Sequence, residues 1–189
     1  NVNDALGPGV WGLDSQDQEA VDKRLIDLDG TKNKSKYGAN AILAVSIAAA
    51  KAAALYSKQP LYAWVNTLAK RVGIGENMHA PTPVFNMING GLHGAGNLDF
   101  QEFFVIPAMS KSFSEDLRAG VEIYLTLGKD LERRGAIHSV GDEGGYAPNL
   151  FTNADALEVL YETIKQTTYQ MGRDVFLGLD VAASVFYKN

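Results

Sequence analysis

Short β-prone segments alternate with long helical segments between residues 81 and 182, and this alternation limits the possible folds more than any other feature of the chain. Two strong helical patterns lie between the second and third β-prone segments. The third segment is a near-continuous apolar run, typical of a buried strand. Together these patterns predict an α/β fold with a parallel sheet. The β-prone segments are PTPVFNMI, FQEFFVIP (100–107) and VFLGLDVA (175–182), and the helical patterns span 112–135 and 153–172.

The chain before this region is predicted to be all-helical up to about residue 73. The first helix begins at Asp14 or Ser15, whose side chains suit an N-cap, and it ends at Gly30. The second helix has few charges and many small residues, so we expect it to be buried with close neighbours on most sides. The predicted helices span 14–30, 38–58 and 60–73.

Composition narrows the class of protein. The net charge is −5, and no run of Lys and Arg exceeds two residues, which argues against nucleic acid as a partner. The chain has no cysteine, so disulfides and thiolate zinc sites are excluded. The longest apolar stretch, 41–50, is too short and too rich in alanine to predict a membrane span, and the first residues lack the pattern of a secretory signal. We expect a soluble cytoplasmic protein. Because no initiator Met begins the chain, we also expect it to be part of a longer one.

Three acidic residues stand at unusual places in the pattern. Glu102 lies inside an apolar strand, where alternation puts it on the same face as Phe104 and Ile106. Glu143 lies in the glycine-boxed segment GDEGG. Asp180 closes the last strand, and polar residues at the carboxyl ends of parallel strands tend to face an active site. Glu102 fits that rule less well, because it lies near the start of its strand.

Each of these residues also has a plain structural interpretation. Glu102 suits a solvent-facing position on an edge strand, Asp180 suits a cap, and GDEGG suits a turn. His93, in the loop NGGLHGAGN, suits a solvated position. Taken together, however, the acids and the histidine indicate carboxylate-bound Mg²⁺ and acid–base chemistry. No glycine-rich nucleotide motif accompanies them. The residues by themselves therefore predict a metal-dependent α/β enzyme.

Five segments occur in order along the chain: LDGTKNKSKYGANAILAVSIAAAKAAA, PTPVFNMINGG, FQEFFVIP, VGDEGGYAPN and GLDVAAS. Together they resemble segments of enolase, the phosphopyruvate hydratase of glycolysis. The resemblance implies an α+β N-terminal domain followed by a TIM-like barrel that starts with the order ββαα. Residues 1–73 would be the helical end of the first domain, and residues 80–189 the first three strands and two helices of an incomplete barrel. The segment NLDFQEF resembles the corresponding segment of bacterial enolases.

The resemblance also implies a reaction and roles for particular residues. Enolase dehydrates 2-phospho-D-glycerate to phosphoenolpyruvate with Mg²⁺, in the cytoplasm and usually as a homodimer or larger assembly. Glu143 matches the acid that helps to expel the substrate hydroxyl, and Glu102 matches a second acid of that network, at the substrate. Gln101 and His93 match substrate contacts, and Asp180 matches a carboxylate ligand of the metal.

Some family features are altered or missing. The family usually has Glu at the position of Val185 and a small residue at that of Leu92, and Gly94 replaces the usual Ala. The lysine base, two further metal carboxylates and the phosphate-binding Arg/Ser pair have no match in the 189 residues. We therefore expect this chain alone to be inactive. A non-catalytic, enolase-like binding or surface protein is the alternative, although retention of all three acids favours the enzyme.

Overall fold

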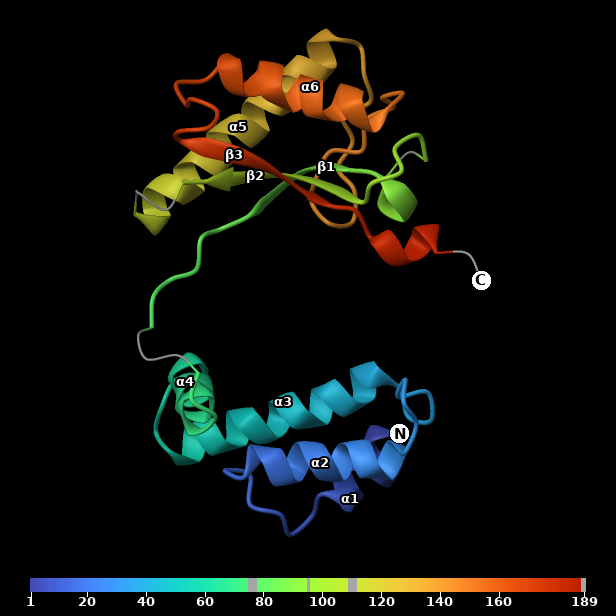
Figure 1. Cartoon of the computed structure of the whole chain (residues 1–189), viewed down its shortest axis with the longest axis vertical. Coiled ribbons are helices and arrows are strands. Elements are labelled where there is room, and N and C mark those ends of the chain that lie inside the picture. The colour runs from blue at the N-terminus through green and yellow to red at the C-terminus, as the bar shows by residue number, and fades with distance from the viewer. Residues whose placement is uncertain (75–77, 95, 109–111, 188–189) are drawn as a thin grey trace. The chain divides into compact units, whose positions relative to one another are not determined.

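The computed structural model describes residues 1–74, 78–94, 96–108 and 112–187. The chain divides into two compact units, Asn1–His79 and Ala80–Asn189 (Figure 1). Each unit has its own hydrophobic core, so each is considered separately.

The regular elements described in the first unit are all helical, as predicted. Leu6, Val21, Leu25, Ile42 and Val45 form its main core, and a smaller cluster surrounds Trp64. The elements are a π-helical turn Val2–Leu6, α1 Gly7–Gly9, α2 Gln18–Asp29, α3 Ala39–Tyr56 and α4 Leu61–Arg71.

Helix α2 begins later than predicted. Its N-cap is Asp17, whose side chain accepts the N–H of Ala20, and not Asp14 or Ser15. Asp14 instead accepts the N–H of Gln16 and closes a turn before the helix, a common alternative for Asp. The predicted end is confirmed, because Gly30 takes the left-handed conformation that terminates the helix.

The prediction that α3 is buried on most sides is wrong. Ile42, Val45, Ala53 and Ala54 are buried, but the opposite side of the helix is exposed. The reason is that neighbouring elements of the unit cover only one side of α3. Among the described residues, α3 is the one helix that is long and apolar enough to cross a membrane. Core helices of soluble proteins can have the same length and composition.

The second unit contains a three-stranded sheet in the order β1-β2-β3, with α5 and α6 together on one face (Figure 1). The chain order is strand, strand, helix, helix, strand, as the family resemblance implies. The strands are β1 Phe85–Asn89, β2 Glu102–Pro107 and β3 Val175–Asp180. The helices are α5 Phe113–Arg133 and α6 Asn153–Lys165, with 3₁₀ turns at Gly91–His93 and Ala183–Phe186.

The predicted parallel pairing is wrong, because β2 runs antiparallel to both β1 and β3. Contacts between Glu122 and Tyr169 and between Asp130 and Thr163 show that α5 and the α6 region run in opposite directions. Such a pair of helices returns the chain to the end at which β2 finished. Strand β3 therefore starts beside Pro107 and runs back along β2.

Burial along β2 alternates as predicted. Phe103 and Val105 are fully buried beneath the two helices, whereas Glu102, Phe104 and Ile106 share the other, partly open face. The prediction of a buried β3 is wrong for most of the strand, since only Val175 is buried and the rest is partly or fully exposed. Strand β3 is the last of the sheet, so its far edge has no neighbouring strand among the described residues.

Helix α6 ends seven residues before the predicted boundary at 172. The hydroxyl of Thr167 donates to the carbonyl of Ile164, and it also accepts the N–H of Tyr169. These local side-chain bonds compete with the helical hydrogen bonds and stop the helix. The prediction for α5 is closer, because Ser112 and Glu115 form a capping box at its start.

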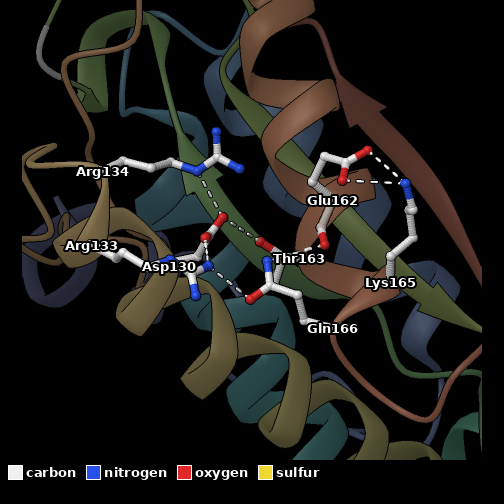
Figure 2. A network of polar contacts seen from close by, with 7 residues as sticks. All are labelled: Asp130, Arg133, Arg134, Glu162, Thr163, Lys165 and Gln166. Carbon is white, nitrogen blue, oxygen red and sulfur yellow. Dashed lines mark hydrogen bonds and ion pairs between the residues drawn. The ribbon is translucent and has the colours of Figure 1, made fainter.

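A buried carboxylate joins the two helices. Asp130 is almost inaccessible and contacts Arg133, while Arg134 Nε donates to its Oδ2 at 2.8 Å. Figure 2 shows these groups facing Thr163 of α6 and Gln166, the residue that directly follows this helix. Burial alone would raise the pKa of Asp130, but the hydrogen bonds from Arg133 and Arg134 outweigh it and lower the pKa.

We expect Asp130→Asn to destabilise the second unit by about 1–2 kcal/mol at pH 7, because it removes the charged acceptor of Arg133 and Arg134. The loss stays small because both arginines are partly hydrated. Since the folded pKa is lowered, this contribution is complete above an unfolded pKa of about 3.9 and fades as the pH falls below it. Urea denaturation at pH 7 and pH 3 measures the difference, which should shrink at pH 3. Glu132→Gln, at an exposed acid of the same helix, is the control.

Candidate active site

Three polar residues form a row across one edge of the sheet. Asn89 at the end of β1 pairs with Glu102, which in turn pairs with Asp180 at the end of β3. Because β2 is antiparallel to its neighbours, its first residue lies beside their last residues. This explains how Glu102 lies beside Asn89 and Asp180 although it begins its strand. Cross-strand partners in a sheet also point to the same face.

A β-bulge brings a second amide to this face. The register of β1 shifts between Asn86 and Ile88, so Met87 is the extra residue. Residues three apart in a regular strand point to opposite faces, but the bulge puts Asn86 and Asn89 on the same one. Asn86 Nδ2 donates to Glu102 Oε1 at 3.1 Å and lies 3.3 Å from Asn89 Oδ1.

The loop of residues 141–145 places Glu143 over this row. Asn89 Nδ2 donates to Glu143 Oε2 at 2.8 Å, and His93 Nε2 lies 3.6 Å from Oε1. The backbone carbonyl of Glu143 also lies 3.4 Å from Asn86 Nδ2. One acid therefore has a separate partner for each carboxylate oxygen.

The glycines of this loop have different roles. A Cβ on Gly145 would lie 2.3 Å from Asn89 Oδ1 and 2.8 Å from Asn86 Oδ1, so only glycine fits beside the two amides. Gly144 has φ of +87°, a conformation that favours glycine. The loop therefore needs glycine at both positions in order to lie close to β1.

Negative charge is concentrated at the row. Burial raises the pKa of Glu102, and the charges of Glu143 and Asp180 and a hydrogen bond shared with Asp180 raise it further, while His93 acts in the opposite direction. Asp180 Oδ1 accepts the N–H of Ala182 at 2.8 Å. The arrangement thus combines a carboxyl group of raised pKa with two nearby acids and a histidine.

Comparison with protein families decides the identity of this fold. Residues 77–189 match the family model described as enolase, C-terminal TIM barrel domain. Residues 1–65 match the model described as enolase, N-terminal domain. The chain belongs to the enolase family. The three strands and two helices of the second unit are therefore part of an enolase-type α/β barrel.

The structure brings together four of the five residues that the enolase resemblance singles out: Glu102, Glu143, His93 and Asp180. The fifth, Gln101, contributes through its backbone, since its N–H donates to the Asp180 carbonyl and its carbonyl accepts the N–H of Gly90. Sequence reasoning missed two residues, Asn86 and Asn89. Two amides within the otherwise apolar FNMIN, just before two glycines, were the available signal.

Two of the three departures from the enolase pattern, Leu92 and Val185, have exposed side chains. Leu92 is 86% exposed and Val185 is 56% exposed. Neither side chain takes part in the hydrogen-bonded contacts of Glu102 and Glu143. The acid arrangement forms with both of these residues in place.

The residues at the row fit Mg²⁺ in chemistry but not in number. Asp180 is exposed and offers carboxylate oxygen, the ligand that Mg²⁺ prefers. In the described part of the chain, however, no three acidic or histidine side chains gather as a metal-binding group. These residues would supply one carboxylate and would not complete a metal site by themselves.

Proposed function

We propose that this chain supplies the acid side of the active site in an enolase that converts 2-phospho-D-glycerate to phosphoenolpyruvate. The reaction removes a proton from the carbon beside the carboxylate and a hydroxyl group from the next carbon, and a double bond forms between them. Hydroxide is a poor leaving group, so a positioned acid that protonates the hydroxyl lowers the barrier.

The convergence of Glu102, Glu143 and His93 on one edge of the sheet carries this proposal. Glu143 has one oxygen toward Asn89 and the other toward His93, so it is oriented rather than free to rotate. Glu102 lies beside it and is hydrogen-bonded by Asn86. We assign Glu143 and Glu102 to protonation of the departing hydroxyl, and His93, Gln101 and Glu102 to substrate binding.

The proposal extends to the metal and the setting of the reaction. Asp180 would be one ligand of Mg²⁺, which when bound neutralises the charge of the substrate carboxylate. A cytoplasmic homodimer or larger assembly is the proposed setting. The other ligands would come from groups outside this row.

We expect the 189-residue chain alone to show no dehydration of 2-phosphoglycerate. No lysine contacts Glu102, Glu143 or Asp180 among the residues that the structure describes, so the lysine base of the proposed reaction is missing here. The ultraviolet absorbance of the enol product measures turnover, in the presence of Mg²⁺, for this chain and for a longer enolase that contains it.

If the longer protein converts the substrate and the 189-residue chain does not, both the proposed function and the inactivity of the chain are supported. Mg²⁺-dependent turnover by the 189 residues would contradict the expected inactivity but not the reaction. If the longer protein bound substrate without converting it, the alternative of a non-catalytic binding protein would replace the proposed function.

A further inference from the structure

Helix α5 holds the backbone of the loop that carries Glu143. Tyr124 Oη donates to the carbonyl of Gly144 at 2.9 Å. Gly144 directly follows Glu143 in the chain. Tyr124 belongs neither to the row of Asn89, Glu102 and Asp180 nor to the glycine-boxed segment. Its hydrogen bond nevertheless ends one residue from Glu143.

Tyr124 is itself well supported. Its ring stacks on that of Tyr146, with centroids 4.5 Å apart and planes inclined by 18°. The backbone of Tyr146 makes two hydrogen bonds to β1. Its N–H donates to the carbonyl of Met87 at 2.9 Å, and its carbonyl accepts the N–H of Asn89 at 2.8 Å. Gly128, one turn beyond Tyr124, leaves room for the Tyr146 hydroxyl, which a Cβ there would approach to 2.3 Å.

Close packing does not fix the loop on this side. A hollow of about 370 Å³ borders it, lined by residues of β1 and α5 and by the loop itself. On this open side, the bond from Tyr124 to the Gly144 carbonyl holds the loop, while Asn86 and Asn89 hold Glu143 from β1. The lining includes Phe85, Val121, Tyr124, Glu143 and Gly144.

We propose that Tyr124 is a positioning residue for Glu143. Its hydroxyl fixes the Gly144 carbonyl, and so sets the position of the Glu143 carboxylate relative to Asn89 and His93. The role in turnover rests on the proposed function, whereas the role in holding the loop does not. Tyr124→Phe tests both, because it removes the hydroxyl and keeps the stacked ring.

The first measurement is amide hydrogen exchange in the 189-residue chain. In Tyr124→Phe, the N–H groups of Gly141 and Gly144 should exchange about two- to tenfold faster, the effect of one lost hydrogen bond. Both groups are bonded within the loop in the native chain. Exchange in the buried parts of α5 and α6 should stay within twofold. Tyr161→Phe is the control, because this tyrosine is 45% exposed on α6.

The second measurement is steady-state kinetics in an active enolase that contains this chain. A displaced Glu143 affects the chemical step, so kcat should fall about three- to tenfold while KM stays within twofold. Tyr161→Phe should leave both values unchanged.

Two results would overturn the proposal: unchanged loop exchange in Tyr124→Phe, or an equal acceleration throughout α5 and α6, which would mean a general structural role. Faster loop exchange with unchanged kcat would overturn the role in turnover. If the unaltered enolase lacked dehydration activity, the proposed function would fail, and the exchange experiment would still decide whether Tyr124 holds the loop.

Discussion

Replacing Glu143 with glutamine is expected to lower the kcat of an enolase that contains this chain by about 10²–10⁴-fold, the range for a positioned general acid. Glutamine has almost the same shape, and its carbonyl oxygen still accepts the hydrogen bond from Asn89 Nδ2. The loop should therefore stay in place. The change removes the group that delivers a proton, together with its charge, but keeps the shape of the side chain, so KM should change much less than kcat.

Asp142→Asn is the matched control for this experiment. Asp142 is the adjacent residue in the same loop, and it is exposed. Its replacement removes the same charge from nearly the same place, so a general effect of charge would appear in both variants. Steady-state kinetics should show Asp142→Asn within about threefold of the unaltered enzyme, since surface charges act weakly through water. Equal losses in the two variants would contradict an acid role for Glu143.

Phe103→Ala is expected to destabilise the second unit by about 3–5 kcal/mol, the usual range for a buried phenylalanine. Phe103 is fully inaccessible and belongs to the core between the sheet and the two helices. The substitution leaves a cavity between rigid elements, which collapse only in part. Urea denaturation, followed through NMR signals of the unit Ala80–Asn189, measures the loss.

Phe104→Ala is the control, since it makes the same change one residue along β2. Phe104 lies on the partly open face, so its truncation should cost about 1–2 kcal/mol. A larger loss for Phe104 than for Phe103 would mean that the register of β2 is shifted by one residue. Such a shift would also move Glu102 away from the acid row.

Sequence patterns located the helices and strands because their signals are local. The capping box at Ser112, the left-handed Gly30 and the alternation along β2 each depend on a few neighbouring residues. The same patterns failed where distant contacts decide the outcome. Strand β3 has the composition of a buried strand but lies at the edge of the sheet, and α3 has the composition of a buried helix but is covered on one side only.

The candidate acids also came from the sequence, as did their family, but their arrangement did not. The antiparallel direction of β2 puts Glu102 beside Asp180, and a single bulge turns Asn86 and Asn89 toward the same face. Neither feature has a local signal, because pairing partners far apart in the chain set the register of a sheet. The amino-acid sequence thus determined which groups are present and which elements carry them. Tertiary packing alone decided which of these groups meet, since only strand pairing and the two covering helices fix their positions in space.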